Sequence, residues 1–553
     1  MINNWLSLAS PNKIQTHFPL IRYENKIIRY NKHFKFLGLI FDSPRLNWDI
    51  QIKELVRNCN SRLNLLRAVS AKTWGADKET ILHLYKAIIR SKIEYGCMAY
   101  SSASKTNLKK LEVIQNTAIR IATGCLKSTS VEALRCEANL PSIKDRLEKQ
   151  TLEYFIRARF LKFENPIQSE ILLKTDILEN LTFLGNKSPA INRASLIVGK
   201  FNLPHMDISP MDVVPPDPPW TNPSVKIEID LVIKVNKSMP NNILKELTKN
   251  TINKYYKDHI EIYTDGSRCK YNNSYRVAAG IYIPSYDQNI LYRLDEIHSI
   301  MIAEIFSIYK AVIWVRETLQ PCKVVVLSDS RAAIQSLQSN NTSSKLVYNC
   351  LHVLRQLFEQ NYDITLQWIP SHVGLQGNEK ADENAKQAIQ LPHITPLSPC
   401  YKDVLNLIKR ENYTLLQYHW QQIKSNEFLG NNKPDWGIRK YDCKTDRKTE
   451  VIITRLRVGK TLLNKHAHKI NVSNTPNCIY CNVEETIEHF ILNCYRYHSL
   501  RTNLKNDLNK IKLNLGNNLS VPLLLGGGDF DDDIKSKIHK CLVNFIKGSC
   551  RKI

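Results

Sequence analysis

The stretch IEIYTDGSR, residues 260–268, decides how the middle of this chain is interpreted. Ile260 and Ile262 fall on one face of a predicted strand, and the pair Gly266-Ser267 then predicts a turn. Asp265 would therefore project from the end of a buried strand, at the point where the chain turns. Two interpretations follow: the carboxylate forms the turn by bonding its own backbone, or it is a metal ligand held on a rigid element. The second interpretation requires partners elsewhere in the sequence.

The size and composition of the chain indicate an ordinary globular protein. With 553 residues, 43% of them hydrophobic, it is long enough for two to four domains. We find no leader pattern at its start and no run of 18 apolar residues, so we expect an intracellular protein without a membrane span, in the nucleus or the cytoplasm. Most of the 14 cysteines are scattered singly, which is typical of a reducing compartment.

The net charge of +25 is unevenly distributed along the chain. It is +14 over residues 1–165, +1 over 166–256, −1 over 257–391 and +11 over 392–553. Basic flanks around a near-neutral centre favour a polyanion, such as nucleic acid, held by the ends of the chain. A generally lysine-rich protein is the alternative, and charge alone does not separate the two.

Changes in residue pattern predict a multidomain α/β protein with five regions. Residues 1–165 are mainly helical after one short strand, FKFLGLIFD, and residues 166–256 form a linker that includes the proline-rich stretch 208–225. Strands and helices alternate over 257–391. Residues 392–470 are helical and basic, and 471–553 contain a group of cysteines.

Acidic residues stand at particular places within residues 257–391. Asp265 and Asp329 close two predicted strands, and Asp382 lies in the first turns of a predicted helix. Glu304 lies inside IMIAEIFSI, part of a helix that is apolar on most sides and therefore largely buried. Because sites form at the carboxyl ends of parallel strands, we expect these carboxylates to lie close together.

A buried group of carboxylates needs cations or protons to neutralise it. Two divalent ions would do so, and oxygen-only ligands favour Mg²⁺ or Mn²⁺. For Asp329 or Asp382 alone, helix capping or a helix-dipole interaction is the more common explanation. Glu304 is harder to explain in this way, because a lone glutamate in an apolar helix is costly without a role.

Four motifs in this region resemble those of type 1 ribonuclease H. They are YTDGS, AEIFSIYKA, VVVLSDS and WIPSHVGLQGNEKADENAK, in the family's order and at compatible spacing. The resemblance implies a mixed five-stranded sheet with helices on both faces. It also implies endonucleolytic hydrolysis of the RNA strand of RNA–DNA hybrids with two Mg²⁺ ions.

The same resemblance implies roles for individual residues. It assigns metal ligation and catalysis to Asp265, Glu304, Asp329 and Asp382, and proton transfer to His372 in a mobile loop. Ser330 and Asn378 match positions near the substrate, although helix capping explains Asn378 equally well. The basic helix with which some family members hold the hybrid is absent, so we expect the basic flanks to hold it instead.

The flanks resemble parts of reverse transcriptases from non-LTR retrotransposons of the jockey type. The segment beginning FKFLGLIFDSPRLNWDIQIKELVRN and the following helices resemble the part after the palm, with the thumb. RLRVGKTLLNKHAHKI and the cysteine group resemble the tail of these polyproteins. Adjacent aspartates occur only at residues 531–533, in an acidic loop. We therefore expect the chain to begin downstream of the palm's catalytic aspartates, as the 3′ part of a retroelement frame without polymerase activity.

The cysteine group in CIYCNVEETIEHFILNC is typical of a structural zinc site. Two thiolates on a tight turn, with a histidine and a cysteine on a following helix, can converge as a closed tetrahedral Zn²⁺ site. The expected ligands are Cys478, Cys481, His489 and Cys494. The alternative is that these cysteines are incidental buried thiols. His466, His468 and His498 are further candidate ligands that could take the place of one of the four.

Two functional hypotheses remain open. The first is an active hybrid-cleaving nuclease whose ends bind nucleic acid, including RNA–DNA hybrid and element RNA. The second is a catalytically silent nucleic-acid-binding remnant of a retroelement. The complete carboxylate set together with His372 favours the first hypothesis. We find no groove-reading helix typical of a sequence-specific DNA-binding regulator.

Overall fold

The computed structural model describes most of the chain and divides it into two compact units. The described residues are 4–5, 21–23, 26–42, 46–71, 74–160, 226–228, 231, 239–271, 274–338, 344–437, 439, 442, 444–511, 519–526, 528–551 and 553. One unit, here called the helical unit, comprises residues 1–152, 178–201 and 411–553. The other, here called the α/β unit, comprises residues 153–177 and 202–410.

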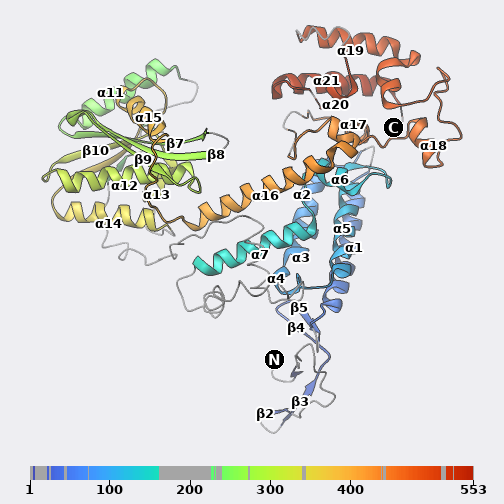
Figure 1. The fold of residues 1–553 in the computed structure, drawn as a ribbon, viewed down its shortest axis with the longest axis horizontal. Helices are drawn as coiled ribbons and strands as arrows, with labels where there is room; N and C mark the ends of the chain where they lie inside the picture. Colours follow the sequence, from blue (N-terminus) through green and yellow to red (C-terminus); the bar gives the residue numbers. More distant parts are fainter. Residues whose placement is uncertain are drawn as a thin grey trace. The chain divides into compact units, whose positions relative to one another are not determined.

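A six-stranded mixed sheet forms the centre of the α/β unit, with the strand order β6-β11-β10-β7-β8-β9 (Figure 1). The strands are β6 Lys226–Glu228, β7 Ile260–Tyr271, β8 Ser274–Ile283, β9 Gln288–Leu294, β10 Lys323–Ser328 and β11 Asp363–Trp368. Pairing is parallel from β6 to β7 and antiparallel from β7 to β9. The prediction of five strands was wrong by one, because β6 comes from the region predicted to be a linker.

Strand β7 is longer than the sequence suggested, and the predicted turn at Gly266-Ser267 is wrong. Parallel pairing with β10 ends at Thr264, opposite Ser328, but pairing with β8 continues to Tyr271. Asp265 therefore lies within a strand, at the end of its parallel part. Gly266 lies in contact with a helix, because an added Cβ would lie 2.7 Å from the backbone nitrogen of Glu304.

Helices cover both faces of the sheet, as predicted (Figure 1). On one face lie α12 Ile300–Thr318, α13 Arg331–Gln338 and α14 Lys345–Glu359. On the other lie α15 Gln376–Ala388 and α11 Asn241–Tyr255. Successive residues of β10 alternate between the two layers: Val324 and Val326 pack with α12, whereas Val325 and Leu327 pack with α11 and α15. Helix α11 also lies within the region predicted to be a linker.

The segment that follows α15 also belongs to the α/β unit. The backbone nitrogen of Thr395 donates to the carbonyl of Arg293 on β9, at 2.7 Å. His298 lies buried between the carboxylate of Asp403 and the carbonyl of Leu397, each 3.1 Å from a ring nitrogen. Asp403, near the start of α16 (Tyr401–Ile423), also accepts a bond from the backbone nitrogen of Ser299, the residue before α12. The start of α12 is thereby fixed by residues beyond the predicted domain end at 391.

The N-terminal part of the helical unit is mainly helical, as expected. Its helices are α1 Asp49–Val69, α2 Lys78–Leu84, η1 Tyr85–Arg90, α3 Ser91–Glu94, α4 Cys97–Tyr100, α5 Lys105–Thr123 and α6 Val131–Ala138, and α7 Ile143–Phe160 begins in it. Short strands precede them: β1 Asn4–Trp5, β2 Ile21–Tyr23, β3 Lys26–Tyr30, β4 His33–Phe36 and β5 Leu39–Asp42. FKFLGLIFD lies in the hairpin β4–β5 rather than in a single strand, because Leu37 and Gly38 both adopt positive φ, at 45° and 83°.

The C-terminal part of the helical unit has its own apolar core. Its helices are α17 Arg447–Arg457, α18 Asn464–Lys469, α19 His498–Lys510, α20 Val521–Gly526 and α21 Asp532–Ser549, and 3₁₀ and π turns η6 to η9 cover Lys424–Asn426, Phe428–Asn431, His489–Asn493 and Tyr495–Tyr497. Leu456 of α17 packs in one core with Phe490 and Phe545, so α17 joins the C-terminal module. Asp531 caps α21 through the backbone nitrogen of Ile534, so residues 531–533 begin a helix rather than form a loop.

A buried ionic network joins the first and last segments of the helical unit, residues 1–152 and 411–553. The fully buried carboxylate of Glu137 contacts Lys78 at 3.1 Å, Arg457 at 3.9 Å and Arg439. Burial by itself raises the pKa of Glu137, but the charges of Arg439, Lys78 and Arg457 outweigh it and hold that pKa well below its usual range. Trp420, Leu429 and Trp436 extend the apolar core of helices α1 to α6 next to this network.

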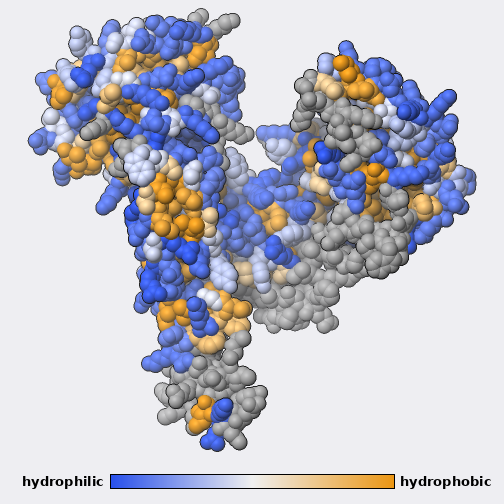
Figure 2. Space-filling model, turned by 180° about the vertical axis from the view of Figure 1, so that it is seen from behind, coloured by the Kyte–Doolittle hydropathy of each residue, from blue (hydrophilic) through white to orange (hydrophobic). Residues whose placement is uncertain are grey.

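The surface in view in Figure 2 is mainly hydrophilic, with small apolar areas between. Among the described helices, none combines the length and the apolar character needed to cross a membrane.

Candidate active site

Three carboxylates from separate elements meet at one edge of the parallel strands. Thr264 and Ser328 are the last residues that pair β7 with β10, so the next residues, Asp265 within β7 and Asp329 after β10, lie at the same level of the sheet. Glu304 reaches them from α12, which packs directly on Gly266. One oxygen from each of the three carboxylates lies within 4.8 Å of the others.

The charges that act most strongly on Asp265 and Glu304 are those of neighbouring carboxylates. Asp265 and Glu304 are each 7% exposed, and the Oε2 atom of Glu304 has no hydrogen-bond partner among the described residues. Burial, with the charges of Asp329 and Asp382, raises the pKa of Asp265 to about 8. Burial, with the charges of Asp265 and Asp329, raises the pKa of Glu304 well above its ordinary value. A buried oxygen without a partner, in a set of oxygen donors only, fits a hard divalent cation such as Mg²⁺.

The second half of the predicted site comes from α15 and the loop before it. A ring nitrogen of His372 and carboxylate oxygens of Glu379 and Asp382 lie within 4.8 Å of one another. Asp382 is close enough to Asp265 to raise its pKa, so the two groups are continuous. Lys386 forms an ion pair with Asp382 at 2.6 Å, one helical turn further along α15.

Glu379 is the residue of this site that the sequence analysis missed. It lies three positions before Asp382 on α15, so both side chains project from the same face of the helix. Its carboxylate accepts a bond from the backbone nitrogen of Gly374, at 3.3 Å. The spacing within GNEKAD could have indicated it, because acidic residues three apart on a helix are neighbours.

Asn378 and Ser330 lie near the carboxylates but make different contacts. Asn378 is 2% exposed in the first turn of α15, and its amide donates to Asp329 at 3.4 Å. Leu375 holds the N-cap position of α15, so Asn378 does not cap that helix. Ser330 accepts a bond from the backbone nitrogen of Ala333 at 3.4 Å and so caps α13. Asp329, for which helix capping was an alternative explanation, is therefore not the residue that caps this helix.

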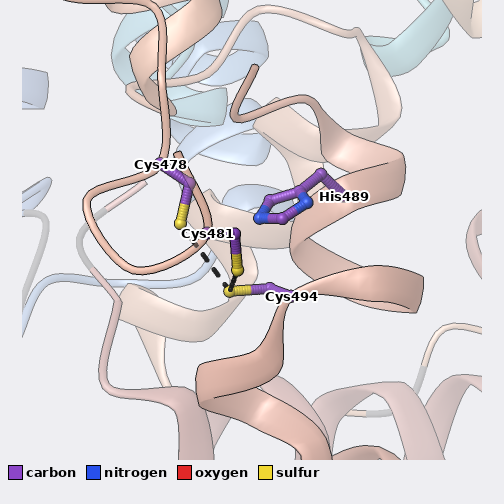
Figure 3. A group of neighbouring side chains, drawn as sticks. All are labelled: Cys478, Cys481, His489 and Cys494. Carbon is purple, nitrogen blue, oxygen red and sulfur yellow. Dashed lines mark hydrogen bonds between the residues drawn. The ribbon is translucent and has the colours of Figure 1, made fainter. Parts of the chain in front are cut away.

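The four residues of the cysteine group also converge, and Figure 3 shows their side chains pointing toward one another. Ligand atoms of Cys478, Cys481, His489 and Cys494 all lie within 4.8 Å of one another. The sulfur of Cys494 lies 3.8 Å from those of Cys478 and Cys481. In a tetrahedral site with Zn–S bonds of about 2.3 Å, sulfur atoms are about 3.8 Å apart, so the spacing fits zinc.

The surroundings of this cluster act differently on its members. The Nε2 atom of His489 is buried without a hydrogen-bond partner among the described residues, and burial lowers the pKa of His489, which favours the neutral imidazole that binds metals. Burial raises the pKa of Cys494 to about 12, whereas the backbone N–H of Tyr495 lowers that of Cys481. Arg501 bonds the carbonyl of Cys494 at 2.6 Å and fixes the chain there.

The alternative histidine ligands lie outside the cluster. A ring nitrogen of His466 lies 2.7 Å from the carbonyl of Thr461, and one of His468 lies 3.0 Å from the carbonyl of Ser473. His498 begins α19 and is not among the four converging residues. The original set of three cysteines and His489 is therefore the one that the fold assembles.

Comparison with known proteins agrees with this geometry. Residues 257–390 match the RNase H family, and this part of the α/β unit is an RNase H domain. The chain is also homologous to RNA-directed DNA polymerases of jockey-type, non-LTR retrotransposons of Drosophila.

Two relatives illustrate the extent of that homology. The chain is 26% identical over 169 residues to a probable RNA-directed DNA polymerase from transposon BS of Drosophila melanogaster, which is 28% of this chain and 18% of that protein. It is 22% identical over 139 residues to the RNA-directed DNA polymerase from mobile element jockey of Drosophila funebris, which is 25% of this chain and 15% of that protein. The matches thus span less than a fifth of each relative.

Proposed function

We propose that the α/β unit is a metal-dependent endonuclease that hydrolyses the RNA strand of RNA–DNA hybrids. The convergence of Asp265, Glu304 and Asp329 carries this proposal, because a buried oxygen of Glu304 has no partner among the described residues. Carboxylates in such a place stay ionised at neutral pH only when cations neutralise them. The RNase H domain over residues 257–390 supports a nucleic-acid backbone as the substrate.

Each residue of the site has a distinct part in this proposal. Asp265, Glu304, Asp329 and Asp382 hold two Mg²⁺ ions, which when bound activate a water and neutralise the leaving oxygen. Asn378 orients Asp329 through its amide. His372 is exposed beside Glu379 and Asp382, where its imidazole can exchange a proton with the leaving oxygen as product departs.

Cleavage of a labelled RNA–DNA hybrid by the full chain tests the proposal. We expect cleavage with Mg²⁺ or Mn²⁺, little with Ca²⁺, and a loss of about 100-fold or more in rate for Asp265→Asn. Asp287→Asn is a matched control, because Asp287 is exposed, lies outside the site and has φ 45°, which asparagine tolerates. Undiminished cleavage in excess chelator would contradict the proposal. Binding of hybrid without cleavage would favour a catalytically silent nucleic-acid-binding protein.

We also propose that Cys478, Cys481, His489 and Cys494 bind one structural Zn²⁺. Their spacing and the buried Nε2 atom of His489 support a closed site, in which zinc stabilises the fold rather than acting on substrate. Metal analysis of purified protein should give about one zinc per chain. Cys481→Ser should lose it and make residues 447–551 more sensitive to protease. Cys269→Ser, at an exposed cysteine on β7, is the control that should retain zinc. Equal protease resistance with and without zinc would refute the proposal.

A further inference from the structure

Helix α11 lies outside the segment that matches the RNase H family, yet it packs against the loop that carries His372. The match covers residues 257–390, whereas α11 spans Asn241–Tyr255. Leu244 and Ile252 of α11 are buried in one cluster with Val373 and Leu375 of the loop. Val373 and Leu375, the two apolar residues of the loop after His372, thus share a buried cluster with this helix.

The backbone of the loop is held in an unusual conformation. His372 has φ 54° and Gly374 has φ 78°, both in the left-handed region. For a residue other than glycine this conformation costs of order 1 kcal/mol or more and persists only where the surroundings hold it. The conformation turns the imidazole toward solvent while Val373 points into the core, where it is 6% exposed.

Polar contacts hold the loop from two sides. The side-chain amide of Asn241, the first residue of α11, donates to the carbonyl of His372 at 3.4 Å. On the opposite side the backbone nitrogen of Gly374 donates to Glu379 on α15, at 3.3 Å. The Nζ atom of Lys245 lies 3.5 Å from where a Cβ on Gly374 would stand, so α11 also covers the loop at that point.

We propose that α11 contributes to the rate of hybrid cleavage and that Asn241 is a positioning residue for His372. Asn241 fixes the carbonyl of His372 and so holds the imidazole beside Glu379 and Asp382. This inference rests on the proposed function, in which His372 handles a proton. A group that transfers a proton must stay within hydrogen-bond reach of its partner, so a loop held in advance raises the rate of the step rather than the affinity for substrate.

Kinetics of the full chain separate positioning from general support of the fold. We expect Asn241→Ala to lower kcat about five-fold with KM unchanged within about two-fold, because one hydrogen bond to the loop is lost. Asn242→Ala is the matched control, since Asn242 is exposed on the same turn and makes no hydrogen bond to the loop in the described part of the chain. It should leave kcat unchanged.

A double-mutant cycle gives the decisive result. In a His372→Ala background, Asn241→Ala should have no further effect on kcat, because the residue through which it acts is gone. An equal loss of kcat in both backgrounds would overturn the inference, as would a wild-type kcat for Asn241→Ala alone.

Hydrogen exchange provides a readout that does not depend on cleavage. In Asn241→Ala the amides of residues 372–375 should exchange faster than in the wild type and in Asn242→Ala. Unchanged exchange there would overturn the inference even if the chain is active. If the wild-type chain cleaves no hybrid, the proposed function fails, and faster exchange in the variant then still shows that Asn241 anchors the loop.

Discussion

Gly266 couples the sheet to the helix that carries Glu304. Its missing side chain allows α12 to approach so closely that an added Cβ would lie 2.7 Å from the nitrogen and 3.0 Å from the Cγ of Glu304. The backbone atom cannot move without shifting the helix. Any side chain at this position therefore displaces Glu304 from Asp265.

Gly266→Ala should accordingly damage both stability and activity. We expect a loss of about 1–3 kcal/mol in the free energy of unfolding, together with a fall in kcat of at least ten-fold and weaker Mg²⁺ activation. Urea unfolding and Mg²⁺ titration of hybrid cleavage measure the two effects. Ser267→Ala, one residue further along β7, is the control that should leave the Mg²⁺ dependence unchanged. Normal Mg²⁺ activation of Gly266→Ala would contradict the close packing described above.

Asp265 is expected to oppose folding when no cation is bound. It is buried beside Asp329 and Glu304, so its charge is repelled and poorly hydrated. In chelator, Asp265→Asn should raise the melting temperature, and the free energy of unfolding should increase by about 1–2 kcal/mol. With Mg²⁺ the wild type should be stabilised and the variant should not. Thermal unfolding with and without Mg²⁺ measures both; equal Mg²⁺ stabilisation of the two proteins would rule out Asp265 as a ligand.

The candidate residues of the site could be named from the sequence because their order and spacing match a family. The structure adds which of their side chains lie close together, which spacing alone cannot show. Asp265, Glu304 and Asp329 form one group, and His372 and Asp382 form a second group with Glu379. The turn predicted at Gly266 failed because a glycine required for close packing and a glycine required for a turn look alike in a sequence. Asn241 could not have been found, since its partner is the backbone of a loop about 130 residues away.

Among the elements, β6, α11 and the segment after α15 extend the α/β unit beyond residues 257–390, which match the RNase H family. β6 has only three residues, too few to show a strand pattern. Helix α11 does show a helical pattern, because Leu244, Thr248 and Ile252 are buried four residues apart. Its helical spacing was overlooked beside the proline-rich stretch 208–225. The apolar patterns of β7 and β10 could be recognised because burial on one or both faces imposes them.

A substitution of Asp403 tests whether the segment after α15 stabilises the α/β unit. Its carboxylate is buried, accepts from the backbone nitrogen of Ser299 and lies 3.1 Å from His298. Asp403→Ala should lower the free energy of unfolding of the α/β unit by about 3 kcal/mol, because it leaves polar groups buried without a partner. Lys402→Ala, at the neighbouring position, should have an effect within about 0.5 kcal/mol. Equal denaturant midpoints for the two variants would show that the segment is dispensable.

The molecule as a whole contains a helical unit whose first and last segments, residues 1–152 and 411–553, are distant in sequence. Glu137 contacts Lys78 within the first segment, and Arg439 and Arg457 of the last segment. Glu137→Gln should lower the free energy of unfolding by about 3–5 kcal/mol, because a neutral amide replaces the buried charge that Lys78 and Arg439 contact. Tryptophan fluorescence during urea unfolding, to which the buried Trp420 contributes, reports this change. Glu132→Gln, on the same helix α6, is the control, and a matching loss there would contradict a special role for the network.

The same unit should be sensitive to mild acid through His539. Burial, with the charge of Arg457, lowers the pKa of His539 to about 4, whereas an unfolded histidine titrates near 6.5. The unfolded chain therefore binds the proton first, and the free energy of unfolding falls as the pH drops from about 6.5 to about 4, by at most about 3 kcal/mol. Urea unfolding at several pH values measures the slope. His539→Asn should flatten it, and an unchanged slope in that variant would assign the effect to other groups.

The separation of Glu137 from Arg439 by 302 residues has a consequence for synthesis on the ribosome. At about 5–20 residues per second, roughly 15–60 s pass between translation of the acidic residue and that of its basic partner. During that interval the whole α/β unit emerges and can fold, while in the N-terminal helices Glu137 has Lys78 beside it but neither Arg439 nor Arg457. The α/β unit is thus complete before the unit that surrounds it in sequence, and a nascent chain stalled before residue 433 would expose the unfinished core to chaperones and proteases.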